Sequence, residues 1–171
     1  MIKHLWNVAV KKDTLWIKWI YMEKLKGRNI WEVQCDSKSS VGWKNIPSLR
    51  DKVRRHIWWK IGNGNKINVW HDRWCIVSPL SEFIDTRDIY DARLSNTSTI
   101  KEIVHEGRWK WPEEWNTYFV ELGQLQVPIL RDGIEDTVWM SRNGHEKIFK
   151  ISNVWVDMNS NGTKVDWHPL V

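Results

Sequence analysis

Apolar side chains recur along this chain with two periods, one typical of helices and one typical of strands. In residues 2–10, Leu5, Trp6, Ala9 and Val10 fall on one helical face. Similar spacing of three and four residues predicts a second helix, which begins at Asp13 as a candidate cap and stops at Gly27. It predicts further short helices in four places: from Trp43 through Ile57, between Thr99 and Gly107, over 112–122, and after Ser152.

Strand-like alternation appears in two stretches, each divided by turn-forming residues. Residues 57–70 alternate on both sides of Gly62–Asn65, and residues 136–152 alternate around Asn143–Gly144. Both patterns are typical of β-hairpins, and Asn-Gly is the strongest two-residue signal for one. The sequence therefore predicts an α+β fold of short helices with two β-hairpins.

The two ends of the chain bear on whether this fold is complete. Residues 2–10 start a helix with no capping residue before it, and residues 167–171 end the chain with apolar groups and no stop signal. We therefore expect an incomplete domain that begins and ends inside a larger protein.

One apolar patch leaves a choice between core and ligand surface. Trp16, Trp19, Ile20 and Tyr21 cluster on the helix that follows Asp13. A patch at helical spacing is more often core than ligand surface. We expect these four side chains to pack in the core.

Length and composition narrow the class of protein. The 171 residues, 42% of them hydrophobic, suit one globular domain with its own core. No apolar run approaches the roughly 20 residues that span a bilayer, and residues 1–12 do not resemble a signal peptide. We expect an intracellular protein without a membrane partner, in the nucleus or the cytoplasm, in which Cys35 and Cys75 remain reduced.

Tryptophan content and charge distribution add a possible partner. The chain has fifteen Trp against three Tyr and three Phe, which favours a Trp-filled core, an aromatic binding surface, or both. Residues 1–75 contain 16 Lys and Arg and 6 Asp and Glu, whereas residues 76–171 contain 10 and 15. The basic half favours an anionic partner, unless the two halves neutralise each other.

Motifs for catalysis, cofactors or metals are not found in the sequence. His71, Asp72 and Cys75 are the best metal candidates, but they lack a ligand spacing typical of such sites, and we interpret them as a surface histidine and a buried thiol. Gly62–Gly64 has strand patterns on both sides and fits a turn rather than a nucleotide-binding loop. We expect no enzyme activity, cofactor or metal ion in this chain.

The positive signal is for nucleic acid. Cations neutralise phosphates, and indole rings stack on bases. Both kinds of side chain gather in residues 43–74, and the alternative is a solvated basic helix beside a Trp-rich core. The candidate RNA- or DNA-binding residues are Lys44, Arg50, Lys52, Arg54, Arg55, Trp58, Trp59, Lys60, Lys66 and Trp70.

A series of motifs in order resembles a known family. They are KKDTLWIKWI (11–20), LKGRNIWE (25–32), GWKNI (42–46), IGNGNKINVWHDRW (61–74), SPL (78–80) and EGRWKWP (106–112). They resemble plant LINE-type (non-LTR) retrotransposon polyproteins, in the region between the reverse transcriptase domain and its zinc-binding domain. The segment at 135–155 is similar to the lead-in to that zinc-binding domain, and 165–171 to the strand that follows.

The resemblance implies a division of the chain and a role for it. Residues 1–146 would be the connector after the reverse transcriptase, and 147–171 the truncated start of the zinc-binding domain. In the family, the catalytic aspartates lie upstream of this region and the zinc ligands lie downstream. The implied function is a non-catalytic fragment that assists nucleic-acid binding beside the missing polymerase and zinc-binding segments. A free-standing RNA- or DNA-binding module and an inert structural remnant are the alternatives.

Overall fold

The computed structural model describes residues 1–34, 41–133 and 136–158, and these residues form the predicted α+β fold. Its α-helices are α1 (Ile2–Ala9), α2 (Leu15–Trp19), α3 (Val41–Ser48), α4 (Arg50–Arg54), α5 (Thr86–Asp91), α6 (Ile100–Ile103), α7 (Trp115–Tyr118), α8 (Val120–Gly123) and α9 (Ile151–Met158). A π-helix, η1 (Ile20–Leu25), continues α2, and η2 (Leu80–Glu82) is a 3₁₀-helix. The strands are β1 (Ile57–Lys60), β2 (Val104–His105), β3 (Arg108–Trp109), β4 (Asp136–Met140) and β5 (Glu146–Lys147).

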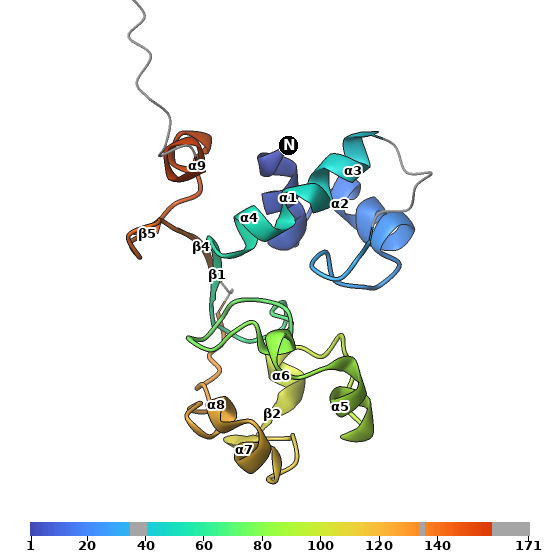
Figure 1. Ribbon diagram of the computed structural model, residues 1–171, viewed down its shortest axis with the longest axis vertical. Coiled ribbons are helices and arrows are strands. Elements are labelled where there is room, and N and C mark those ends of the chain that lie inside the picture. The colour runs from blue at the N-terminus through green and yellow to red at the C-terminus, as the bar shows by residue number, and fades with distance from the viewer. Residues whose placement is uncertain (35–40, 134–135, 159–171) are drawn as a thin grey trace, which may run out of the picture.

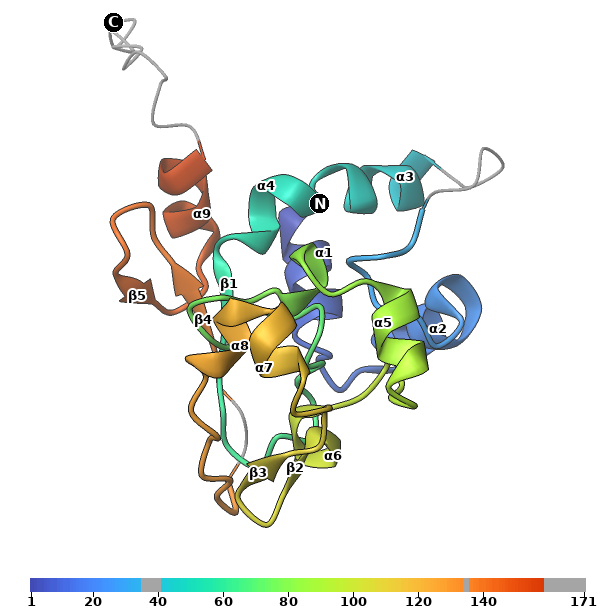
Figure 2. The same ribbon diagram turned by 60° about the horizontal axis from the view of Figure 1, so that its bottom comes forward.

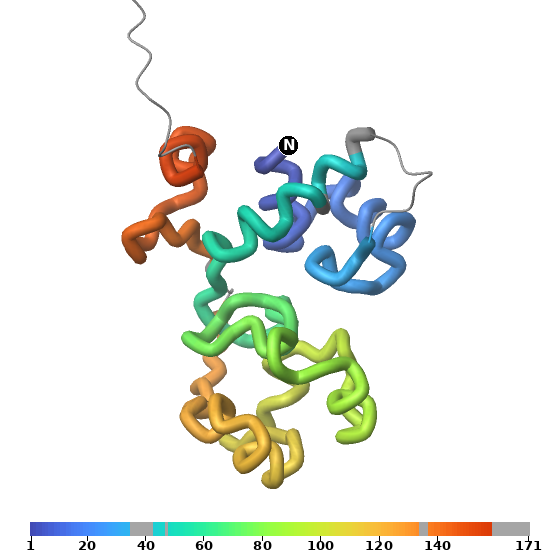
Figure 3. The backbone as a smooth tube through the Cα atoms, viewed as in Figure 1, coloured from blue at the N-terminus to red at the C-terminus, as the bar shows by residue number. Residues whose placement is uncertain are grey.

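These elements form two lobes, each with its own hydrophobic core. In the helical lobe, α1–α4, η1 and α9 surround one core; in the loop-rich lobe, residues 61–133 surround the other (Figure 1). The chain passes from the first lobe to the second through β1 and returns through β4 (Figure 3). Within β1, Ile57 belongs to the first core and Trp59 to the second, so this strand connects both.

The sheet between the lobes corrects the first predicted hairpin. β1 pairs antiparallel with β4, with Ile57 opposite Trp139 and Lys60 opposite Asp136, and β4 then pairs with β5. Residues 67–70 do not pair with β1. Instead, Asn68 forms an isolated bridge to Thr99, and the Ile67 carbonyl accepts a hydrogen bond from the Ile100 amide.

The reason for this error lies in Asn68. Its side-chain Oδ1 accepts hydrogen bonds from the amides of Trp70 (3.0 Å) and His71 (2.9 Å). Asn commonly forms such local turns, which compete with a strand ladder. Ile67 and Val69 are buried, but their backbone partners, Ile100 and Ser98, lie in a distant segment of the chain.

Two hairpins are nevertheless present in the part of the chain that the structure describes. The predicted one around Asn143–Gly144 forms between β4 and β5, with Trp139 opposite Lys147. The other joins β2 and β3 beside α6 (Figure 2), where we expected the helix to run on to Gly107. Glu106 and Gly107 both have positive φ, as a tight hairpin turn requires, and the α-helix stops at Ile103.

The N-terminal helices confirm part of the pattern and correct the rest. α1 buries Leu5, Trp6 and Ala9, as its spacing predicts. The cap of α2 is Thr14 rather than the predicted Asp13. The Thr14 hydroxyl accepts a hydrogen bond from the Ile17 amide.

The apolar patch on α2 and η1 was only partly predicted. Ile20 is buried, whereas the side chains of Trp16 and Trp19 are 40% and 48% exposed. Our expectation that both indoles pack in the core is wrong, because α2 turns this face toward a cleft.

Further predictions meet the structure with different results. α6 begins after Thr99, as expected, and the structure adds a capping box with Glu102, but the helix predicted over 112–122 divides into α7 and α8 at Phe119. Phe149 and Val154 pack on the core of the helical lobe, and the proposed domain division at 146 stays a prediction.

Cys75 is a free, half-buried thiol, whereas Cys35 and residues 159–171 lie outside the described residues. Among the described residues, no helix is long and apolar enough to cross a membrane.

Candidate nucleic-acid interface

The structure separates the ten candidate residues into buried and outward-facing groups. Trp59 and Trp70 are buried in the core of the loop-rich lobe. The Trp70 Nε1–H donates to the Ser95 carbonyl at 2.8 Å. Neither ring has a free face on which a base could stack in this conformation.

Two of the candidate arginines are structural. The Arg50 guanidinium donates to the carbonyls of Val33 (2.7 Å) and Ile30 (3.2 Å), which secures the segment before α3. The Arg54 guanidinium lies 5.5 Å above the Trp31 ring and donates to the His71 carbonyl at 2.7 Å. Burial lowers the pKa of Arg54, and both guanidinium groups are engaged by backbone carbonyls of the protein itself.

An outward-facing group lies at the end of α4 and on β1. Lys52, Arg55 and Lys60 are exposed, and Trp58 is half-buried. The Arg73 guanidinium lies 4.9 Å above the Trp58 ring, a cation–π pair. We call Lys52, Arg55, Trp58, Lys60 and Arg73 the β1 surface.

Lys60 has a partner of its own on this surface. Its ammonium forms a salt bridge of 2.5 Å with Glu146 on β5, and both side chains are about half exposed. Exposed pairs of this kind contribute little to stability. Lys60 is thus accessible, but part of its charge is neutralised by a neighbour.

Lys44 and Lys66, the remaining candidates, are also exposed and lie elsewhere. Lys66 lines a cleft of about 360 Å³ with Lys11, Lys12 and Lys18, and the Lys11 ammonium donates to the Lys66 carbonyl. The structure thus brings two lysines of the α1–α2 connection, and Lys18 of α2, beside Lys66 of the 61–74 motif. Sequence reasoning did not predict this second basic surface, because its lysines are 48 or more positions away from Lys66.

A buried polar network joins the two lobes, where residues 71–74 of the loop-rich lobe meet residues 30–32 of the helical lobe. The Trp31 Nε1–H donates to the Asp72 carboxylate at 2.9 Å, and the Asn68 amide donates to the same carboxylate at 2.8 Å. Burial raises the pKa of Asp72, although these donors and the charges of Lys11 and His71 oppose the shift. Asp72 is therefore a structural acceptor between the lobes.

The second half of this network centres on Glu32. Its carboxylate lies 3.3 Å from His71 Nε2 and accepts from the Asn96 amide group at 2.5 Å. Burial alone would raise the pKa of Glu32, but the His71 and Asn96 interactions outweigh it and the pKa is lowered. We call Trp31, Glu32, Arg54, Asn68, His71, Asp72 and Asn96 the inter-lobe network.

The network also corrects our interpretation of the candidate metal trio. His71 is buried rather than on the surface, and Cys75 is only half-buried. Burial raises the pKa of the Cys75 thiol, which favours the protonated form over the thiolate that binds metals. Within residues 1–34, 41–133 and 136–158, no group of three or more His, Cys, Asp or Glu side chains is arranged to hold a metal ion.

Comparisons with known proteins add no identification. No protein-family model matches this sequence, and neither the curated proteins nor the solved structures give a significant match.

Proposed function

We propose that this chain is a non-catalytic connector of a LINE-type retrotransposon reverse transcriptase polyprotein, and that it contributes a single-stranded nucleic-acid contact to the parent. The order of motifs across the chain supports the family. The β1 surface supports the contact. It presents three exposed cations and a half-buried indole, and RNA or DNA is the partner.

The observation that carries the proposal is a division of roles within residues 50–74. Arg54, His71 and Asp72 are inside the inter-lobe network, where their polar groups have structural partners. Lys52, in the same helix as Arg54, and Arg55, directly after that helix, face solvent. The motif residues therefore support a scaffold on which neighbouring cations remain accessible to an anion.

Charge supports the same partner. Residues 1–34 and 41–56 of the helical lobe contain twelve Lys and Arg against four Asp and Glu. A basic surface of this kind binds the phosphate backbone with an affinity that falls as salt rises. We therefore expect binding without strong sequence preference.

The test is fluorescence anisotropy of the full chain with a labelled single-stranded RNA at several salt concentrations. The double variant Lys52→Gln/Arg55→Gln should flatten the slope of log K against log salt by about 1.4, which is roughly 0.7 for each lost phosphate contact. Arg54 is left intact, because its removal would disturb the inter-lobe network.

The matched control removes the same two types of charge from the loop-rich lobe. Lys101→Gln/Arg108→Gln replaces two exposed cations there and should leave the slope as in the unmodified chain. An equal slope for the β1-surface variant would exclude that surface. RNA-dependent DNA synthesis by the purified chain would contradict the non-catalytic role.

A protein-interaction role is the second candidate, favoured by a separate observation. Ile148, Ile151, Trp155 and Val156 are large apolar side chains exposed on and before α9. Exposed apolar patches often mark contacts with other proteins. Concentration-dependent dimerisation that Trp155→Ser abolishes, in a chain that fails to bind RNA, would favour this alternative.

A further inference from the structure

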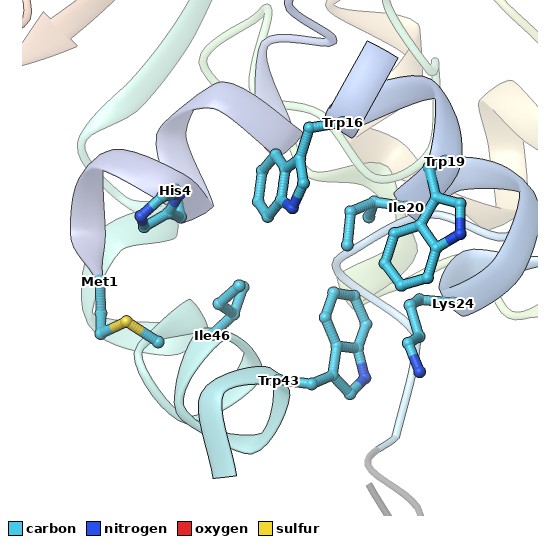
Figure 4. Close-up of a pocket in the computed structure, with 8 residues that line it drawn as sticks. All are labelled: Met1, His4, Trp16, Trp19, Ile20, Lys24, Trp43 and Ile46. Carbon is cyan, nitrogen blue, oxygen red and sulfur yellow. The ribbon is translucent and has the colours of Figure 1, made fainter. Parts of the chain in front are cut away.

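A cleft on the helical lobe is lined largely by aromatic rings from three separate elements. Its volume is about 320 Å³, at the lower end of the roughly 300–1,000 Å³ typical of small-molecule sites. Trp16 projects into it from α2, and Trp43 projects from α3 on the opposite side (Figure 4). Trp19 and Ile20 form a third wall between them.

Burial separates the roles of the three indoles. Trp43 is almost fully buried, whereas Trp16 and Trp19 are nearly half exposed. An indole prefers to remove its apolar ring from water. Two such rings left open at one cleft provide a stacking surface that the chain does not cover with its own described residues.

Lys24 places a cation at the rim of the same cleft. The Lys24 ammonium lies 5.6 Å above the Trp19 ring, and the His4 ring lies 5.2 Å from that of Trp16. Lys24 would repel a cationic ligand such as a quaternary ammonium group. In the surrounding helical lobe, Lys and Arg outnumber Asp and Glu. This excess of positive charge likewise favours a ligand with negative charge.

These features together select a nucleobase attached to a phosphate backbone. A base presents a flat π-face to an indole, and its phosphates complement Lys24 and the basic lobe. An apolar peptide segment would use the rings but gain nothing from the charge. We propose that the cleft between α2 and α3 is a stacking site for unpaired bases of a single-stranded nucleic acid. This inference rests on the proposed function and names a second contact for it.

The experiment compares two labelled oligonucleotides of about 15 nucleotides, a length near the larger site sizes of single-strand binders. One is oligodeoxythymidylate, and the other is an abasic strand with the same phosphates and no bases. Stacking predicts that the full chain binds the thymidylate strand at least tenfold more tightly, and that Trp16→Leu/Trp19→Leu removes this preference. The same variant should leave the salt slope unchanged, whereas Lys24→Gln should flatten it by about 0.7.

Matched variants separate stacking from loss of folding. Trp155→Leu removes an indole that is 66% exposed on α9 and should retain the preference for bases. Trp16→Phe/Trp19→Phe keeps aromatic faces and should restore most of the preference. Circular dichroism of each variant checks that its helices are intact.

The outcomes distinguish the cleft from the β1 surface. Loss of the thymidylate preference in the Trp16/Trp19 variant alone, with an unchanged slope for Lys52→Gln/Arg55→Gln, supports the cleft and excludes the β1 surface. Equal binding of both strands by the unmodified chain overturns the stacking site and leaves the β1 surface standing. Failure to bind either strand overturns both, and tight binding of an apolar peptide instead would assign the cleft to a protein partner.

Discussion

The two lobes are stabilised in different ways, although both have cores rich in tryptophan. The helical lobe buries periodic apolar positions of α1, α4 and η1, and its surface is strongly basic. The loop-rich lobe, residues 61–133, has eight Lys and Arg against eleven Asp and Glu. Its short elements are connected by side chains that hydrogen-bond to backbone.

Ser78 illustrates how the loop-rich lobe is stabilised. Its hydroxyl accepts from the amides of Trp74 (2.9 Å) and Cys75 (3.0 Å) and donates to the Cys75 carbonyl. Backbone groups without helix or strand partners need such substitutes when they are buried. The loop-rich lobe therefore depends on side-chain hydrogen bonds for its backbone, whereas the helical lobe contains most of the basic residues of the candidate binding surfaces.

The largest expected effect tests whether the two lobes unfold together. Trp139 lies in the core of the helical lobe and Trp70 in that of the loop-rich lobe, and both are fully buried. Each of Trp139→Ala and Trp70→Ala should lower the free energy of unfolding by about 3–5 kcal/mol. In urea titrations, circular dichroism and tryptophan fluorescence should shift together, because β1 and the inter-lobe network join the cores. Two separated transitions would show that the lobes are independent.

A smaller effect is expected from one hydrogen bond of the inter-lobe network. Trp31→Phe retains a buried ring but removes the donor to the Asp72 carboxylate. Leaving this buried acceptor without its donor should lower the free energy of unfolding by about 1–3 kcal/mol. Trp58→Phe, which removes a more exposed indole donor to the Arg55 carbonyl, is the control and should cost less than about 1 kcal/mol. Equal losses of unfolding free energy from the two variants would mean that the hydrogen bond from Trp31 to Asp72 stabilises the fold no more than the exposed one does.

The smallest effect concerns pH and the start of β1. The His56 ring stacks on Trp139 at 4.7 Å, and its Nδ1 lies 2.6 Å from the Met140 carbonyl. Burial lowers the pKa of His56, so below about pH 6.5 the unfolded chain takes up this proton before the folded chain does. Its contribution to stability is therefore present above that pH and is lost as the pH falls through the folded pKa.

Urea titrations between about pH 7 and 5 measure this dependence. His56→Phe should flatten the profile by at most about 1.4 kcal/mol per pH unit, the limit for one proton. His105→Gln alters an exposed ring in the loop-rich lobe and serves as the control. A profile that His56→Phe leaves unchanged would contradict the assignment of this proton to His56.

Local signals in the sequence predicted several elements correctly, for reasons that can be named. α1 follows from the spacing of its buried residues, and the capping box at Thr99 and Glu102 starts α6 where expected. Asn143–Gly144 forms its hairpin because Gly144 tolerates the positive φ of the turn. Each of these signals depends on neighbours within a few residues.

The candidate site was predicted less well, since exposure depends on distant partners. Arg50, Lys52, Arg54 and Arg55 look alike in the sequence, but only Lys52 and Arg55 remain exposed. Arg54 is removed from the surface by Trp31 and His71, which approach it from other segments. Helical spacing places Arg50 and Arg54 on one face beside the buried Val53, but the partners that cover this face come from other segments of the chain.

Local signals in the sequence predicted the fold class, the start of α6 after Thr99, the β4–β5 hairpin and the unequal distribution of charge. The tertiary structure alone decided that β1 pairs with β4, that Asp72 serves the inter-lobe network, and that Trp16 and Trp19 face a cleft. The physical reason is range: turns, caps and periodic faces are local interactions. Burial, strand partners and shared cavities, in contrast, depend on contacts between segments that the chain brings together only when it folds.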